Sequence, residues 1–303
     1  MVAVAITHNP SSIEAAIEQA LGLLPLDDLV RGRLVAVKPN ETWASADDTT
    51  GVTQPDTLRG VLRAWRQLGP SDLGVSGGAG AAETDEVFRH AGLMHVLQEQ
   101  HCPLFDHNRP PFVSVDLTYA PDNDVNGPQQ AVMVNPRVLE YQTLVSLAQL
   151  KLRATATVTL SLKNIAMSLP AADYYGHPRS KQHHEHGFFD DMHSFIAGMA
   201  NRFRIGLAVI VGHPAMIATG PLGGHAVDTG LVIASTDPLA ADVVGARLLG
   251  FDVQAVRHLW EARRLGLGES DLSRLEFPGL SVQQAIQEFT AAAYGETLTF
   301  SHA

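Results

Sequence analysis

"RLVAVKPN", residues 33–40, reads as a buried strand that ends at Pro39 and opens a strand–helix–strand unit. "QPDTLRGVLRAWRQLG" at 54–69 predicts a helix with a C-terminal glycine, and "DLGVSGGAG" at 72–80 predicts a second strand that runs into glycines. A strand, a helix and another strand in this order are typical of parallel strands joined by a crossover helix.

The same alternation continues on both sides of this unit. A strand and a helix precede it, a helix is expected over 83–100, and further strands and helices follow from residue 143 to the C-terminal region. We therefore expect an α/β fold with a mainly parallel sheet and helices on both faces, as a single unit over 1–303 or as two lobes. The loop-rich stretch near 118–135 would be the lobe boundary or an inserted hairpin.

Composition and charge narrow the function classes. Of the 303 residues, 45% are hydrophobic and 17% are charged, which is ordinary for a globular protein. The formal net charge of −11 argues against a nucleic-acid partner and gives no support for binding an anionic membrane surface. The single cysteine, Cys102, cannot hold an iron–sulfur cluster. No signal peptide is visible and the longest apolar runs are too short to span a bilayer, so we expect a cytoplasmic protein with no membrane partner.

Polar side chains are expected at the carboxyl ends of the strands, where open α/β sheets bind their ligands. Lys38 and Asn40 follow the apolar part of "RLVAVKPN", and Lys163 and Asn164 close a predicted strand "TVTLSLKN". Two lysines at one sheet edge would make a locally positive site that suits a small anionic molecule, either a carboxylate or a phosphate. The alternative is that both are ordinary surface lysines at strand ends.

Two glycine-rich patches add candidate substrate-binding positions. In "GVSGGAG" the bare backbone amides just before a helix could cradle an oxyanion or a phosphate, and "HPAMIATGPLGGH" is a second such patch. Neither is a complete dinucleotide-binding fingerprint. With Asn40, the candidate positions are Ser76, Gly77, Gly78, Gly80, Gly223 and Gly224.

Asp242 completes the candidate catalytic set of Lys38, Lys163 and Asn164. It lies one turn into the predicted helix "DPLAADVVGARLLG", between apolar residues. A carboxylate in such surroundings is usually paired. We therefore expect Asp242 to pair with Lys38 or Lys163, and to tune that lysine or to take a proton.

Together these segments resemble the DUF362 family, whose function is unassigned. The matching segments run in family order from about residue 33 to 268 and include "VAVKPNETW", "TVTLSLKNIAM" and "GPLGGHAVDTGLVIASTDPLAADVVGARLLG". The resemblance implies an α/β protein whose motifs carry the lysines and the "DPLAAD" helix. Many relatives also carry a ferredoxin-like module with clustered cysteines, which is missing here, and Arg153 stands where they usually have a histidine.

A second likeness is to the lactate racemase family, which binds a nickel-pincer cofactor. There a lysine holds the cofactor covalently and a downstream histidine ligates nickel. Lys163 followed by His177, or by the histidines at 183–186, repeats that order. The likeness is limited to the order of the lysine and the histidines along the chain, because no long motif matches.

The segment "YYGHPRSKQHHEHGFFDDMH" at 174–193 holds five of the fourteen histidines. Imidazoles and carboxylates are the preferred ligands of zinc, iron, manganese and nickel, so a divalent ion is the expected cofactor. The alternatives are a metal-free polar lid over the active site and a solvated loop, because "HHEH" lacks the order of the zinc-protease motif. Aromatic pairs bracket the cluster and favour an active-site loop over 170–193. The candidate ligands are His177, His183, His186 and Asp190.

Three functional hypotheses follow. The first is a metal-dependent enzyme that acts on a small anionic substrate by redox chemistry, isomerisation or hydrolysis. The second is a racemase or epimerase of the nickel-pincer type, with Lys163 as the cofactor anchor. The third is a non-catalytic protein that binds an anion or a metal. An exposed edge strand would allow any of them to form a homodimer.

Overall fold

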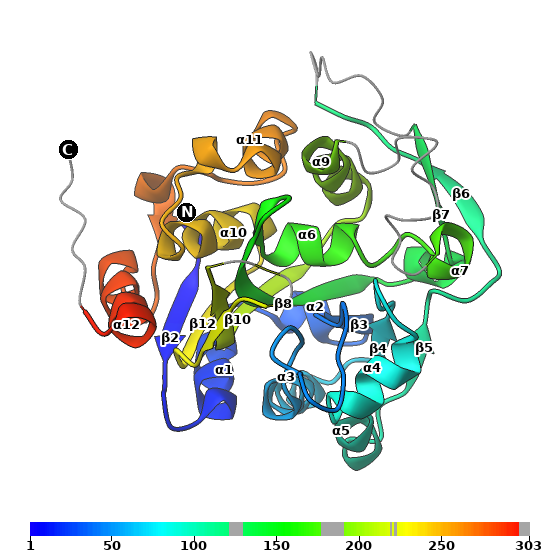
Figure 1. The fold of residues 1–303 in the computed structure, drawn as a ribbon, viewed down its shortest axis with the longest axis horizontal. Coiled ribbons are helices and arrows are strands. Elements are labelled where there is room, and N and C mark those ends of the chain that lie inside the picture. The colour runs from blue at the N-terminus through cyan, green and yellow to red at the C-terminus, as the bar shows by residue number, and fades with distance from the viewer. Residues whose placement is uncertain (121–129, 177–190, 219, 221–222, 297–303) are drawn as a thin grey trace.

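The computed structural model describes residues 1–120, 130–176, 191–218, 220 and 223–296. In this part of the chain nine strands form one sheet, shown in Figure 1. From edge to edge the main path is β2 (Ala5–His8), β12 (Leu231–Ser235), β10 (Leu207–Ile217), β8 (Thr143–Arg153), β3 (Leu34–Pro39), β4 (Asp72–Gly77) and β5 (Leu104–Asp106). β9 (Thr157–Thr159) pairs with β8, and β11 (His225–Val227) pairs with β10.

The sheet is mainly parallel, as the sequence predicts. β10, β8, β3, β4 and β5 run parallel to one another, while β12 is antiparallel to both β10 and β2. The chain builds outward from β3 to β4 and β5, and then places β8 on the other side of β3. Strand order therefore reverses between β3 and β8. Open α/β sheets bind ligands at such a switch point, beyond the carboxyl ends of the strands.

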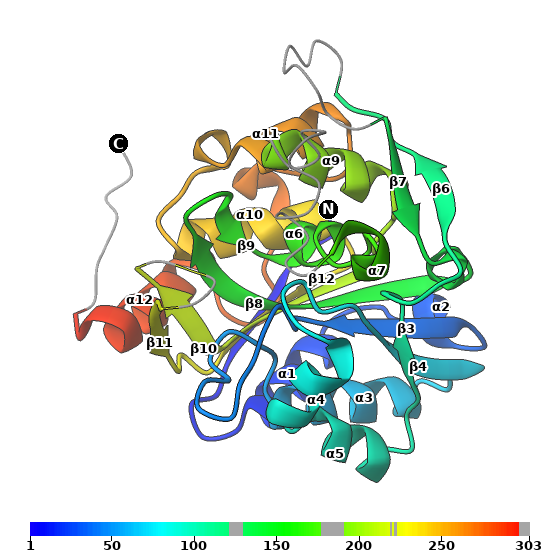
Figure 2. The same cartoon turned by 45° about the vertical axis from the view of Figure 1, so that its right-hand side comes forward.

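Helices cover both faces of the sheet (Figures 1 and 2). In β3, Val35 and Val37 belong to the apolar core on one face and Ala36 to the core on the other, because alternate residues of a strand point in opposite directions. On the first face lie α1 (Ile13–Gly22), α3 (Pro55–Gln67), α4 (Thr84–His90) and α5 (Leu93–Glu99). On the second lie α6 (Ser161–Ala166), α9 (Met192–Arg202), α10 (Pro238–Leu248), α11 (Arg257–Arg264) and α12 (Val282–Tyr294).

Short elements complete the fold. β6 (Val113–Asp116) and β7 (Ala131–Val134) pair antiparallel in a separate two-stranded sheet, at the predicted lobe boundary near 118–135. Val115 and Val132 of this pair join the apolar core on the α6 face. The remaining short elements are β1 (Val2–Ala3), paired with β13 (Leu275–Glu276), α2 (Asp27–Val30) and α7 (Ala172–Tyr175).

Two sequence expectations about these elements are wrong. The helix expected over 83–100 is two helices, α4 and α5, because Gly92 between them takes a left-handed backbone φ of 72°. The strand expected over "TVTLSLKN" ends at Thr159, and the helix α6 follows it. Lys163 and Asn164 therefore project from a helix placed over the sheet edge and not from a strand end.

Candidate functional site

A cavity of about 300 Å³ lies at the switch point, where β3 and β8 end beneath α6. Four cationic side chains line it, Lys38, Lys151, Arg153 and Lys163, and Glu41 is the one carboxylate in the described lining. We call this cavity the lysine pocket. The pocket brings together segments that are far apart in the sequence. This agrees with the expectation that polar side chains at the ends of different strands lie close together.

Apolar side chains also line the pocket. They are Trp43, Met167 and Met192, from the loop after β3, the end of α6 and the start of α9. A ligand in the pocket would therefore meet both basic side chains and apolar surface. Pockets for small molecules commonly combine the two, with a few polar groups that orient the ligand.

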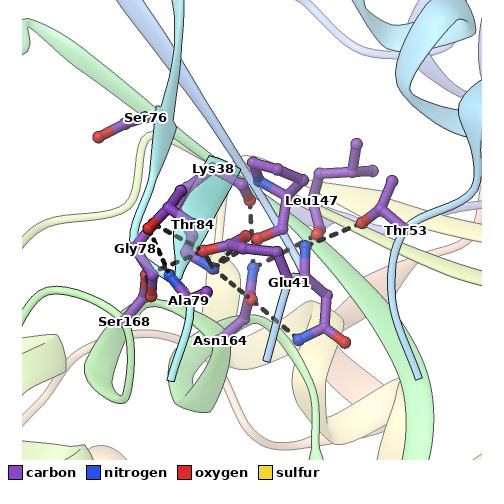
Figure 3. A network of polar contacts seen from close by, with 12 residues as sticks. Lys38, Glu41, Thr53, Ser76, Gly78, Ala79, Thr84, Leu147, Asn164 and Ser168 are labelled. Carbon is purple, nitrogen blue, oxygen red and sulfur yellow. Dashed lines mark hydrogen bonds and ion pairs between the residues drawn. The ribbon is translucent and has the colours of Figure 1, made fainter. Parts of the chain in front are cut away.

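Lys38 is paired within the protein. It is 2% exposed, and the two carboxylate oxygens of Glu41 each lie 2.8 Å from its Nζ atom. The Glu41 carboxylate also accepts hydrogen bonds from the Gly78 amide at 3.0 Å and the Ser168 hydroxyl at 3.2 Å (Figure 3). The amide of Gly78, expected to bind an anionic ligand, thus binds a side-chain carboxylate of the protein.

Asn164 holds the two strand ends to α6. Its Oδ1 accepts hydrogen bonds from Lys38 Nζ at 3.2 Å and from Asn40 Nδ2 at 3.4 Å. Its Nδ2 donates to the Lys38 carbonyl at 3.2 Å (Figure 3). It also lies within hydrogen-bond distance of the Ser146 hydroxyl, at 3.1 Å. Because the protein satisfies both ends of this amide, Asn164 positions the lysine pocket.

Lys151 lies near the end of β8 and is 1% exposed. Its Nζ donates hydrogen bonds to Asn40 Oδ1 at 2.7 Å and to the Gly51 carbonyl at 2.9 Å. Burial, together with the nearby charges of Arg153 and Lys38, lowers the pKa of Lys151 to about 7. This lysine therefore loses its proton close to neutral pH.

Lys163 differs from the other two lysines. It is 7% exposed, and within the described residues its side chain makes no hydrogen bond or ion pair. Burial, with the charges of Arg153, Lys151 and Lys38, holds the pKa of Lys163 well below its usual value. Its amine faces the cavity and forms no hydrogen bond or ion pair with another described residue.

The expected pairing of Asp242 with a lysine is wrong. Asp242 is fully buried, and its Oδ1 accepts hydrogen bonds from the backbone amide of Ser161 at 2.7 Å and from the Ser161 hydroxyl at 2.5 Å. Its Oδ2 accepts from the backbone amide of Leu162 at 2.9 Å. Burial raises the pKa of Asp242 to about 7. The carboxylate caps the first turn of α6, so it supports the helix that carries Lys163 and Asn164.

The comparisons with known proteins agree with the motifs above. The family described as "Domain of unknown function (DUF362)" matches residues 35–247. The chain belongs to this family. It is also similar to the thylakoid-associated protein sll1697 of Synechocystis sp., with 24% identity over 251 residues, 82% of this chain and 72% of that protein. No solved structure matches the chain described here. In the described part of this DUF362 chain, no helix is long and apolar enough to cross a membrane.

The other predicted substrate-binding positions divide into two groups. Asn40, Gly78 and Gly80 line the lysine pocket of the DUF362 fold. Gly77 and Ser76, by contrast, are not among its lining residues. The Ser76 hydroxyl lies 2.9 Å from His107 Nδ1 and accepts a hydrogen bond from the Tyr141 hydroxyl at 3.0 Å, and Figure 3 shows it apart from the contacts around Lys38.

Gly223 and Gly224 lie before β11, in the connection from β10, and neither lines the lysine pocket. The four predicted metal ligands, His177, His183, His186 and Asp190, fall outside the described residues. Within the described ranges no group of three or more histidine, cysteine, aspartate or glutamate side chains could hold a metal ion. The divalent ion therefore stays a prediction.

The pocket lining also includes residues that the sequence analysis did not select as site residues, among them Glu41, Lys151, Arg153 and Thr159. Glu41 follows directly on the "VKPN" motif, and Lys151 follows directly on "TLVSLAQL", which predicts a buried strand. A charged residue at the end of a buried strand was the available signal for Lys151. Thr159 carried no such signal, because threonine is common in strands of every kind.

Proposed function

We propose that this DUF362 protein is an enzyme that acts on a small anionic substrate bound in the lysine pocket. The observation that carries the proposal is the excess of basic side chains in a buried cavity, where the described lining residues include Lys38, Lys151, Arg153 and Lys163 and one carboxylate, Glu41. Buried charges without partners destabilise a protein. An anionic ligand would offset that cost, which favours a carboxylate or a phosphate group as the bound moiety.

The lowered lysine pKa values favour catalysis over binding alone. A group that gains and loses a proton close to the working pH is suited to general acid–base chemistry. Lys151 has a pKa of about 7, and the pKa of Lys163 is also well below its usual value. A substrate held by its anionic group beside these amines could give up a proton to one of them. This supports proton-transfer reactions such as isomerisation.

The cavity limits the size of the substrate. Its volume of about 300 Å³ is at the lower end of the range for small-molecule pockets, so a compound of few heavy atoms fits best. Trp43, Met167 and Met192 would contact the uncharged part of such a compound. The substrate is therefore expected to be a short anion and not a nucleotide.

Isothermal titration calorimetry with oxalate and inorganic phosphate tests the binding step. Arg153→Gln removes a charge from the pocket, while Arg31→Gln removes an exposed one that pairs with Asp27 before the opposite end of β3. We expect affinity to fall about tenfold in the first variant, because a partly buried charge contact is worth about 1–2 kcal/mol, and to be unchanged in the second. The proposal fails if neither anion binds, or if both variants weaken binding equally.

Turnover separates an enzyme from the non-catalytic alternative. Deuterium exchange into small hydroxy and oxo acids, followed by NMR, detects proton transfer next to a carboxylate without knowledge of the natural substrate. An anion that binds tightly while no compound exchanges would favour the protein that only binds. Exchange that requires the lysine pocket, and is lost in Arg153→Gln, would support the enzyme.

The predicted metal dependence is a further part of the proposal and rests on the sequence alone. Iron, nickel, zinc and manganese are the candidate ions. Elemental analysis of the purified protein and of a His183→Ala/His186→Ala variant tests it, with a stoichiometric metal lost in the variant as the expected result. The nickel-pincer alternative predicts in addition a covalent mass adduct on Lys163. The predicted cytoplasmic location also stays a proposal, and cell fractionation tests it.

A further inference from the structure

Lysine is rare in this chain, and the pocket holds most of it. The sequence has 21 lysine and arginine residues, of which only four are lysines. Lys38, Lys151 and Lys163 line the lysine pocket, and the fourth, Lys181, lies outside the described residues. Arginine keeps its proton in proteins, whereas a buried lysine can lose it and act as a nucleophile. The use of lysine at this site therefore points to amine chemistry and not to charge alone.

Within the part of the chain that the structure describes, one of the three pocket lysines has an amine without a hydrogen bond or ion pair. Lys38 is held by Glu41, and Lys151 is held by Asn40 and the Gly51 carbonyl. Lys163 makes no hydrogen bond or ion pair in the described part of the chain, although it is buried and lines the cavity. The cations around it disfavour its protonated form. Such a desolvated amine next to other cations is the environment of a nucleophilic lysine.

Thr159 supplies a second uncommitted group in the same cavity. Its side chain is 3% exposed, and its hydroxyl oxygen is buried without a hydrogen-bond partner among the described residues. A buried hydroxyl without a partner costs about 1–3 kcal/mol, so a ligand oxygen that accepts its hydrogen bond would be favoured. The pocket thus combines a free amine, a free hydroxyl donor and a charged guanidinium on Arg153.

We propose that Lys163 forms an imine with a small 2-oxo acid, whose carboxylate lies against Arg153 and whose carbonyl oxygen accepts a hydrogen bond from Thr159. This inference rests on the proposed function, because it requires an anionic substrate in the lysine pocket. It names the substrate class that the free amine selects. A carboxylate alone would satisfy the cations, but only a carbonyl group uses the amine and the hydroxyl as well.

The step balances without an oxidant or a cofactor. The unprotonated Nζ of Lys163 attacks the carbonyl carbon, and the π electron pair moves to the oxygen, which gains a proton as the nitrogen loses one. A proton from solvent then moves to the hydroxyl of this carbinolamine, the carbon–oxygen bond breaks and the oxygen leaves as water. The nitrogen lone pair forms the carbon–nitrogen double bond of the protonated imine, which can return the proton to solvent. The amine and the carbonyl compound therefore give an imine and water. The protonated imine can next withdraw electrons from the neighbouring carbon, which makes its proton easier to remove.

Reductive trapping tests the inference on the full chain. The protein is incubated with glyoxylate and sodium cyanoborohydride, which reduces the imine to a stable carboxymethylated amine. Intact mass measures the number of added groups, and peptide mapping locates them. We expect Lys163 to be modified at least about tenfold faster than Lys181 or the α-amino group. Thr159→Val, which keeps the side-chain shape, should slow the reaction about tenfold.

Lys163→Met is the matched variant, because it removes the nucleophile and keeps an uncharged side chain of similar length, as the unprotonated amine is uncharged. It should show no modification at this position, while Lys181 and the α-amino group react as in the unaltered chain. Modification of Lys163 no faster than that of Lys181 would overturn the inference. Oxalate, which lacks a reactive ketone or aldehyde, separates the two proposals: binding of oxalate without trapping of glyoxylate refutes only the imine, and failure of both refutes the anion pocket too.

Discussion

Two buried charged regions lie on either side of α6, and they are built in opposite ways. At Asp242 a single carboxylate accepts three hydrogen bonds from Ser161 and Leu162, so every donor around it is used. The described lining of the lysine pocket holds four basic side chains and one carboxylate, and Lys163 has no hydrogen-bond or ion-pair partner among the described residues. The first region is complete without a ligand, whereas the second is not. A buried charge that the protein leaves unpaired is a stronger indication of function than a buried charge that has its partners within the protein.

The largest expected effect is on the free energy of unfolding, when Asp242 is replaced. Asp242→Ala should lower the free energy of unfolding by about 3 kcal/mol, because it leaves the buried donors of Ser161 and Leu162 without an acceptor. Urea denaturation measures it. Ser12→Ala at the N-cap of α1 is the control and should cost about 1 kcal/mol, since its side chain accepts from the Ala15 amide in an ordinary helix cap. Equal losses in the two variants would remove the distinction drawn for Asp242.

An effect of similar size distinguishes two lysines of the same pocket. Lys38→Met breaks a buried ion pair and leaves Glu41 without its partner, so it should lower the free energy of unfolding by about 3 kcal/mol. Lys163→Met removes an amine without such a partner, and should leave stability unchanged or raise it by about 1 kcal/mol. Thermal and urea unfolding of the two variants measure the contrast. A strong destabilisation by Lys163→Met would show that this lysine is structural.

The smallest effect is the pH dependence of anion binding. Between pH 6 and pH 8.5 we expect oxalate affinity to fall about fivefold, because Lys151 loses its charge as the pH rises through about 7. Stability of the free protein should respond in the opposite sense. The pKa of Lys151 in the folded state lies below its ordinary value of 10.5, so the unfolded chain binds more protons between these limits, and this group makes folding more favourable as the pH rises.

Calorimetry at the two pH values, in buffers of different ionisation enthalpy, measures both the affinity and the protons taken up on binding. A Lys151→Met variant provides the reference, since its affinity should vary less with pH. Oxalate binding that strengthens toward pH 8.5 would contradict the role given to the lysines.

The sequence predicts the scaffold well because buried parallel strands require apolar runs. "RLVAVKPN" therefore indicates both β3 and the position of Lys38 at its end. The secondary structure of short segments is harder to predict. The alternation in "SLKN" fits a strand as well as a helical turn, and a hydrogen bond to Asp242, which is far away in the chain, stabilises the helix α6. The partners of Lys151 could not be predicted, because they come from the loop after β3 and depend on the tertiary fold.

The scarcity of lysine has a practical side. Amine-reactive labels, cross-linkers and affinity tags usually attach to many positions on a protein, but this chain offers them only its α-amino group and four lysine side chains, three of which line the cavity. In the purified protein, a small amine-reactive reagent would thus report whether the pocket is occupied. The same property makes the protein a candidate for lysine-directed covalent inhibitors, whose selectivity normally suffers from the abundance of competing amines.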